Sequence, residues 1–164
     1  MSISVTLRQA EARLAYIAIA YHLARPGSEL DPQTRTQAQH GLAEVARQVQ
    51  PQLKLASVTI DLDPFQLERL GSAILGAANE LKVYPMLEER PADEGGGRRS
   101  MVPGFDETLR HLFPQVEEDA EEAVALVEPL IALKRRLDEA GNAAAPSTSA
   151  APPARSPWQF WRRA

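Results

Sequence analysis

The chain contains no cysteine, which excludes disulfide bonds, thiolate zinc sites and cysteine nucleophiles. It also lacks the motifs G-x-S-x-G, H-E-x-x-H and G-x-G-x-x-G, so it carries no local signature of an α/β-hydrolase, a zinc protease or a dinucleotide-binding protein. Its most apolar run covers only residues 14–24, whereas a membrane-spanning helix needs roughly 20 residues. The sequence therefore predicts no transmembrane span, and the missing cysteine fits a cytoplasmic protein.

Aromatic residues are scarce and the charge is unevenly distributed. The formal net charge is −4 over 164 residues. Residues 142–164 contain Arg155, Arg162 and Arg163 and no acidic residue, so they carry +3 and residues 1–141 carry −7 (−4 minus +3). An acidic body with a basic tail argues against broad affinity for nucleic acid, which needs a basic surface.

Residues 57–82 form the most core-like stretch. Val58, Ile60 and Leu62 alternate with polar residues, and this period of two predicts a half-buried strand. Asp63 and Pro64 then predict a helix N-terminus, because aspartate accepts hydrogen bonds from the first turn and proline needs no donor there. The apolar stripe of the helix consists of Leu67, Leu70, Ile74, Ala77 and Leu81.

Gly71, Ile74 and Gly76 form the predicted packing face of this helix. A glycine in a helix interior costs about 1 kcal/mol relative to alanine, so close approach of another backbone is the expected compensation. We expect the face to contact either the helix of residues 8–25 or a second copy in a homodimer.

A strand followed by a helix is also predicted at the start of the chain, over residues 2–7 and 8–25. Both predicted strands contain Ser-Val-Thr and both helices have an early Arg-Leu pair. This similarity indicates a βα unit used twice, and chance likeness of amphipathic segments is the alternative. If the unit repeats, the strands pair as a ribbon that helices must cover, because an isolated two-stranded ribbon is marginal in water.

Two further segments lie around this pair of units. Asp31 and Pro32 predict a helix that continues to residue 50. Residues 83–104 contain three prolines and a glycine run followed by Arg98 and Arg99. This segment lacks the spacing of a phosphate-binding loop, so we expect a flexible loop rather than an anion site.

Residues 106–140 are predicted to be helical again. Pro114 is expected to separate a short first helix from a longer second one. Pro129 is expected to kink the longer helix, because it removes a backbone hydrogen bond. Gly141 is the predicted stop.

Together these elements predict a mainly α fold, a bundle-like domain of four to five helices with two short strands over residues 1–141. Residues 142–156 are rich in Ala, Pro and Ser, cannot bury enough apolar surface to fold, and predict a disordered linker. Residues 157–164 are predicted to form an aromatic, basic docking tail.

Few side chains combine into a pattern that predicts chemistry. The glutamates form two helical neighbour pairs, Glu117 with Glu121 and Glu118 with Glu122. Metal sites in helical bundles also use Glu-x-x-His, which the chain lacks. The histidines lie on three separate segments, at His22, His40 and His111. We therefore expect no metal and no cofactor, and the alternative is an enzyme with a site near His22 or residues 84–104.

The tail carries the one specific functional signal. Its aromatic and basic side chains are Trp158, Phe160, Trp161, Arg162 and Arg163. Such residues favour the interface of an anionic membrane and also the centres of protein interfaces, while folding back on the acidic body is a third interpretation. The predicted function is a small, self-associating adaptor or regulatory protein without enzymatic activity, attached through this tail to a protein partner or a peripheral membrane site. The alternative is an enzyme or ligand-binding domain with a site between helices.

Overall fold

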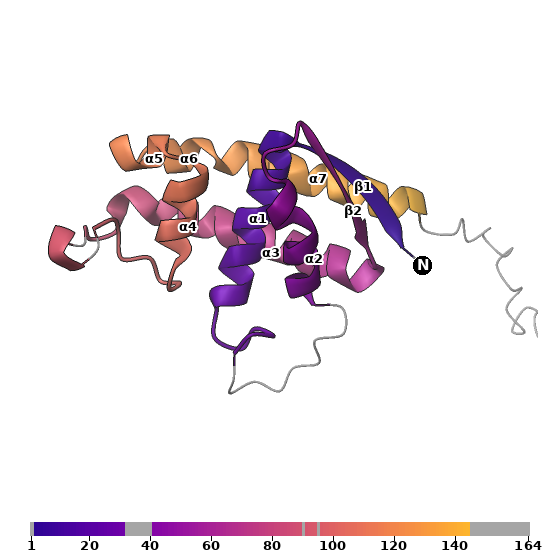
Figure 1. The fold of residues 1–164 in the computed structure, drawn as a ribbon, viewed down its shortest axis with the longest axis horizontal. Helices are drawn as coiled ribbons and strands as arrows, with labels where there is room; N and C mark the ends of the chain where they lie inside the picture. Colours follow the sequence, from indigo (N-terminus) through magenta and orange to yellow (C-terminus); the bar gives the residue numbers. More distant parts are fainter. Residues whose placement is uncertain (1, 32–40, 90, 95, 145–164) are drawn as a thin grey trace, which may run out of the picture.

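A computed structural model of the chain describes residues 2–31, 41–89, 91–94 and 96–144, which form a mainly α-helical fold with one small sheet (Figure 1). The longer helices are α1 (Gln9–Ala24), α2 (Leu42–Val49), α3 (Pro64–Val83), α4 (Phe105–Leu112) and α7 (Val127–Ala144). The short elements are α5 (Gln115–Glu118), α6 (Glu122–Ala125) and the 3-10 turns η1 (Gln50–Gln52), η2 (Tyr84–Met86) and η3 (Ala92–Glu94). The strands are β1 (Ile3–Arg8) and β2 (Ser57–Leu62). The predicted fold class is confirmed.

The two strands pair as an antiparallel ribbon with one apolar and one polar face. The inward pairs are Ile3–Leu62, Val5–Ile60 and Leu7–Val58, all of them buried. On the outer face the Ser4 hydroxyl donates to the Asp61 carboxylate at 2.5 Å. A slip of one residue would turn every apolar side chain outward, so the alternation fixes the register. The helices α1, α2, α3 and α7 all contact the ribbon and cover it.

The two helices that follow the strands begin with side-chain caps. The Asp63 carboxylate accepts hydrogen bonds from the backbone N–H groups of Phe65 (2.8 Å) and Gln66 (2.9 Å). The Gln66 side chain accepts in return from the backbone N–H of Asp63 at 3.0 Å, which completes a capping box. At the start of α1, the Glu11 carboxylate accepts from the backbone N–H of Arg8 at 2.8 Å. The predicted starts of both helices are therefore confirmed.

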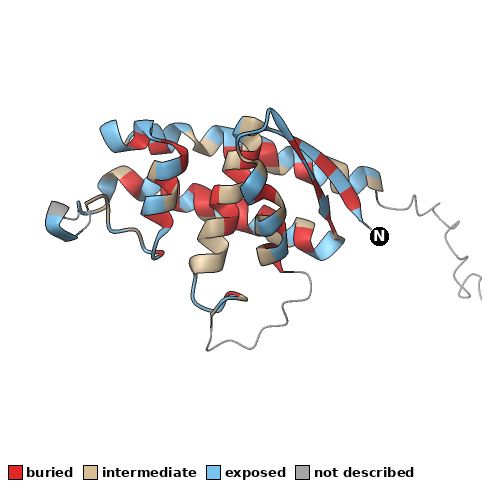
Figure 2. Cartoon of the chain, viewed as in Figure 1, coloured by how far each residue is buried: buried red, intermediate tan, exposed pale blue. Residues whose placement is uncertain are grey.

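The hydrophobic core lies where α3 packs between α1 and α7 (Figure 2). Ile17 on α1, Ile74 on α3 and Leu130 on α7 are each fully buried. Burying one such side chain stabilises the fold by about 1.5–3 kcal/mol. Ile74, predicted for the packing face of α3, therefore belongs to the core of a single chain.

Gly76 allows α1 and α3 to approach closely. A Cβ placed at Gly76 would lie 2.5 Å from Cε1 of Tyr21 on α1. The Tyr21 ring in turn packs edge-on against Phe105, with ring centroids 5.5 Å apart. A Cβ at Gly71 would meet only Cε of Lys134, at an ordinary 3.7 Å. Gly76 is thus sterically required, whereas Gly71 is not.

The course of α7 differs from the prediction at both ends. Pro129 is the third residue of the helix, where no backbone donor is needed, so the predicted kink inside a longer helix is wrong. The predicted stop at Gly141 is also wrong, because α7 continues to Ala144. A Cβ at Gly141 would lie 2.7 Å from Cδ2 of Leu67. This glycine therefore lets α7 approach α3 and does not end the helix.

The acidic segment after Pro114 is broken into two single turns. Pro114 separates α4 from α5 as predicted. Asp119 is extended (φ −141°, ψ 113°), and its carboxylate accepts a hydrogen bond from the backbone N–H of Glu121 at 2.9 Å. An aspartate that bonds to nearby backbone in this way competes with the helix. The predicted continuous helix is therefore interrupted here.

The described part of the helix predicted over residues 32–50 begins after Gly41. Gly41 is extended (φ −77°, ψ 156°) and forms the N-cap of α2, so α2 starts at Leu42. Residues 32–40 lie outside the described part of the chain. A Cβ at Gly41 would lie 2.5 Å from a carboxylate oxygen of Glu29. A side chain distant in sequence therefore occupies the space at this helix start.

Candidate functional site

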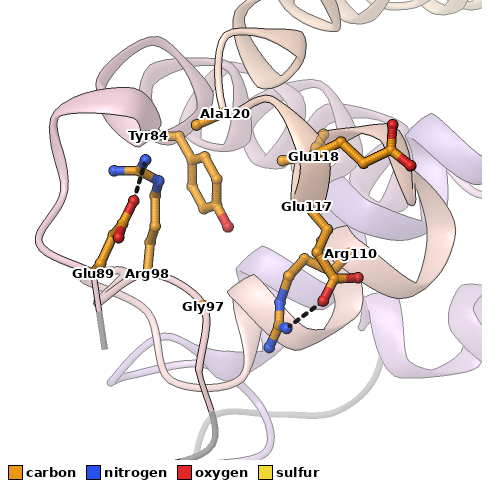
Figure 3. A pocket seen from close by; sticks show the side chains of 9 residues that line it. Tyr84, Glu89, Gly97, Arg98, Arg110, Glu117, Glu118 and Ala120 are labelled. Carbon is orange, nitrogen blue, oxygen red and sulfur yellow. Dashed lines mark hydrogen bonds and ion pairs between the residues drawn. The ribbon is translucent and has the colours of Figure 1, made fainter. Parts of the chain in front are cut away.

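A group of charged side chains surrounds a cavity of about 270 Å³ between the connection after α3 and the helices α4 and α5 (Figure 3). Tyr84 comes from η2, Arg98 from the connection, Arg110 from α4 and Glu117 from α5. Four separate segments thus bring polar groups to one place. The sequence does not predict that these side chains lie around one cavity.

Asp106 is the buried acceptor beside this cavity. It is only 6% exposed, and its carboxylate accepts hydrogen bonds from the Tyr84 hydroxyl and from Nε of Arg110 at 3.1 Å. Arg110 also lies 3.5 Å from a carboxylate oxygen of Glu117. These partners offset the cost of burying a charge. Burial first, and the hydrogen bond to Asp106 second, raise the pKa of Tyr84, so its phenol stays a donor.

Arg98 fastens the connection between α3 and α4. One of its Nη atoms donates to the carbonyl oxygens of Pro85 (2.9 Å) and Leu87 (2.7 Å), and the other donates to Glu89 at 3.1 Å. Its guanidinium lies 5.9 Å from the centroid of the Tyr84 ring, within the range of a cation–π contact. The arginine after the glycine run therefore binds the protein's own backbone.

A second buried carboxylate fixes the following residues. Glu80 of α3 accepts hydrogen bonds from the Ser100 hydroxyl (2.5 Å) and from the backbone N–H of Met101 (3.0 Å). Gly97 has a φ of +77° and packs so closely on Asp106 that a side chain would collide with the carboxylate. Part-buried hydrogen bonds thus link the described residues of this connection to α3 and to its own backbone. The flexibility of the loop stays a prediction.

The hydrogen bonds around the Figure 3 cavity are directed into the fold. Tyr84 donates to Asp106, Arg98 donates to two carbonyls, and Arg110 is held by two carboxylates. Figure 3 marks the pairs of Arg98 with Glu89 and of Arg110 with Glu117. A nucleophilic site needs a nucleophile within hydrogen-bond reach of a base that a third group orients. No such trio occurs among the residues that line this cavity. The arrangement links the connection after α3 to α4 and α5.

His22 lies in a second charged cluster, with Glu29 and Arg69. The Glu29 side chain is 2% exposed. Its Oε1 accepts a hydrogen bond from the backbone N–H of Ala43 at 2.5 Å. Its Oε2 has no hydrogen-bond partner among the described residues and lies 4.0 Å from Nε2 of His22 and 3.6 Å from Nη1 of Arg69. The Glu29 carboxylate thus caps the N-terminus of α2 by accepting from a first-turn N–H. Gly41, the N-cap residue, has no side chain that could do so.

Burial of His22 lowers its pKa, and the attraction of Glu29 offsets that shift only in part. The imidazole is therefore neutral at pH 7. Its distance of 4.0 Å from Glu29 exceeds hydrogen-bond reach. In this structure the imidazole and the carboxylate are therefore not hydrogen-bonded to each other.

A wider groove of about 1000 Å³ lies between α1, η1 and α4. Its apolar lining comes from Tyr16, Pro51, Leu53, Leu112 and Pro114, and its charged or titratable lining from Arg13, Lys54, Glu107 and His111. Within the described part of the chain, the side chains of Arg13 and Lys54 have no hydrogen-bond or ion-pair partner. The groove thus combines apolar surface with two unpaired cations, the chemistry of a binding site.

The residues predicted to bind a partner or a membrane are Trp158, Phe160, Trp161, Arg162 and Arg163, and all of them lie outside the described residues. Their role stays a prediction. His40 lies outside as well. Gly71, Ile74 and Gly76 make helix contacts within one chain, and self-association through this face stays a prediction.

His111 lies exposed on α4, beside the groove. The predicted glutamate pairs are exposed and are divided by the turn at Asp119. Within residues 2–31, 41–89, 91–94 and 96–144, no group of three or more histidine, aspartate or glutamate side chains is arranged to hold a metal ion. In the same residues, no helix combines the length and apolar character needed to cross a bilayer.

Three structurally important groups were missed by sequence reasoning. The pair of Asp106 and Arg110 has a readable signal, because residues four apart on a helix are neighbours. Glu29 has no such signal in the sequence, because its hydrogen-bond partner Ala43 lies 14 residues further along the chain. Arg13 and Lys54 line the same groove only because α1 packs against the turn that follows η1. Their spacing in the sequence therefore does not predict that they lie together.

Comparison of the chain with protein-family models, curated proteins and solved structures finds no match.

Proposed function

We propose that the protein is a small adaptor or regulatory protein without enzymatic activity, attached through its C-terminal segment to a protein partner or an anionic membrane surface. The observation that carries this proposal is a contrast within the chain. The polar side chains around the Figure 3 cavity serve the fold itself. Both tryptophans of the chain, by contrast, lie at Trp158 and Trp161, beside two arginines and after a stretch without acidic residues.

The position of α7 supports this role. Its C-terminal end lies at the same end of the body as the start of β1 (Figure 1), and Arg136 on α7 donates to Glu11 and to the Thr6 carbonyl. These contacts thus fasten α7 to the start of the chain eight residues before the helix ends at Ala144. Residues 145–156 span up to about 40 Å when extended, which is enough for the tail to reach a separate surface.

The physical properties of the segment fit either surface. Tryptophan and phenylalanine gain from the membrane interface, and arginine gains from anionic lipid. In a protein interface, tryptophan and arginine are the usual anchors. A single short anchor binds weakly, and two copies in a homodimer raise the avidity.

The test uses the full chain and two double substitutions, Trp158→Ala/Trp161→Ala and Arg162→Gln/Arg163→Gln. Cosedimentation with phosphatidylcholine vesicles, with and without phosphatidylglycerol, measures membrane binding. Attachment to anionic lipid predicts that both variants lose binding and that added salt weakens it. Attachment to a protein predicts no vesicle binding and loss of a captured partner in the tryptophan variant.

A matched control removes two cations from the body, in Arg47→Gln/Arg135→Gln. Both residues are exposed, and the change in net charge equals that of the tail arginine variant. The control should bind as the parent chain does. If neither vesicle binding nor partner capture depends on the tail residues, the proposal is wrong.

A second candidate function is that of a ligand-binding helical domain with a site between helices. The groove between α1, η1 and α4 favours it, because apolar side chains and unpaired cations line the same concave surface.

A further inference from the structure

The charge of the groove between α1, η1 and α4 is opposite to that of the body. Two cations, Arg13 and Lys54, line it against one carboxylate, that of Glu107, whereas residues 1–141 carry −7 in total. Arg98 and Arg110, in contrast, bind carboxylates or carbonyls of the chain itself. A positive concave surface on an acidic body attracts anions selectively.

The groove also presents apolar surface beside these cations. Leu112 is buried, and Tyr16 and Leu53 are half-buried and pack against the core. Burial raises the pKa of Tyr16, so its hydroxyl remains protonated and able to donate. The volume of about 1000 Å³ lies at the upper end of the roughly 300–1,000 Å³ usual for small-molecule sites.

We infer that this groove binds a small amphipathic carboxylate. Arg13 and Lys54 receive the carboxylate, and the side chains of Tyr16, Leu53 and Leu112 receive its hydrocarbon or aromatic part. The inference rests on the second candidate function and does not depend on the tail. Charge complementarity selects this occupant, because arginine and lysine form strong, charge-assisted hydrogen bonds with carboxylates.

The chain's own C-terminal segment is a poor occupant for this groove. Arg162 and Arg163 have the same sign as Arg13 and Lys54, so like charges would meet. An uncharged apolar molecule would leave both cations unpaired. The anionic group of the ligand therefore contributes the selectivity, and the apolar lining contributes further affinity.

The test uses octanoate and 1-octanol as probes for the isotope-labelled full chain, followed by two-dimensional NMR. Octanoate should shift the amide signals of Arg13, Lys54 and Leu112, with a dissociation constant about tenfold smaller than that of 1-octanol. The indole signals of Trp158 and Trp161 should not move. Shifts confined to the indoles would assign binding to the tail and overturn the inference.

The variant Arg13→Gln/Lys54→Gln should weaken octanoate binding about tenfold and leave 1-octanol binding unchanged. The matched control is Arg47→Gln/Arg135→Gln, which removes the same charge from exposed positions on α2 and α7. The single variant Lys54→Gln is the check against a folding defect, because Lys54 lies in an exposed turn. It should also weaken octanoate binding. Equal binding of the two probes, unchanged octanoate binding in the groove variants, or equal weakening in the control would overturn the inference.

Discussion

At the scale of single residues, close contacts separate glycines that look equivalent in the sequence. Gly71 and Gly76 lie on the same helix and were predicted to share one packing face. Only Gly76 lies where a Cβ would collide, at 2.5 Å from Tyr21. The requirement for glycine is thus set by one ring on α1, which no local pattern reveals.

This contact predicts opposite signs for two matched substitutions. Gly76→Ala should lower the free energy of unfolding by about 1–3 kcal/mol, because the Tyr21 ring is wedged against Phe105 and cannot move away without cost. Gly71→Ala should raise it by about 0.5–1 kcal/mol, because alanine favours the helix and meets no obstacle. Urea unfolding followed by circular dichroism measures both. The same sign and size for the two variants would contradict the contact.

Tyr84 makes a prediction at alkaline pH. Its pKa in the folded state is raised above the ordinary value of 10.0, so the unfolded state releases the proton first. The stabilisation is therefore complete below pH 10.0 and is lost as the pH rises toward the folded-state pKa. Tyr84→Phe should cost about 1.5–3 kcal/mol at neutral pH and flatten this alkaline loss.

The control for this prediction is Tyr21→Phe, which retains the packing ring and has no hydroxyl hydrogen bond to lose among the described residues. Thermal unfolding between neutral and alkaline pH compares the variants. An unchanged alkaline loss in Tyr84→Phe would exclude the buried hydrogen bond to Asp106 as its source.

At the scale of elements, the sequence predicts what local interactions decide. The alternation of Val58, Ile60 and Leu62 predicts β2, and Asp63 before Pro64 predicts the start of α3, because alternation and capping act within a few residues. The extended conformations of Gly41 and Asp119 escape prediction. At Gly41, the carboxylate of Glu29 fills the space that a side chain would need. At Asp119, the carboxylate accepts a hydrogen bond from the backbone N–H of Glu121, although the local sequence is also compatible with a helix.

The start of α2 makes a further prediction. Glu29→Ala should lower stability by about 1–2 kcal/mol and speed hydrogen exchange at Ala43, because the backbone N–H of that residue loses its buried acceptor. Glu44→Ala is the control, since its pair with Arg47 at 2.6 Å is solvent-exposed and such pairs contribute at most about 1 kcal/mol. Equal exchange rates at Ala43 in both variants would show that Glu29 does not cap α2.

At the scale of the whole molecule, one candidate site follows from the composition of the sequence and the other only from the folded structure. The tail is visible from the sequence alone, because its tryptophans and arginines concentrate in residues 157–164. The groove was missed, because Arg13, Lys54 and Leu112 lie on three segments that only the packed fold brings together. Contacts between distant segments decide such surfaces, and a single sequence does not display them.

The end of α7 is the boundary at which the helical body can be separated from the tail in experiments. Gly141 lies inside α7 and packs on Leu67, so ending the chain at Gly141 would remove the last three residues of the helix. A chain that ends at Ala144 retains the whole of α7. Point substitutions in the full chain remain the cleaner test of the tail, because they leave every described contact in place.

The central claim is that the C-terminal segment attaches the body to another surface. Affinity capture from a cell extract that retains membranes, with the full chain and its Trp158→Ala/Trp161→Ala variant side by side, tests it most directly. The claim predicts that a protein or a membrane fraction retained by the full chain is lost from the variant, while thermal unfolding of the two chains is unchanged. Equal retention by both chains would contradict it.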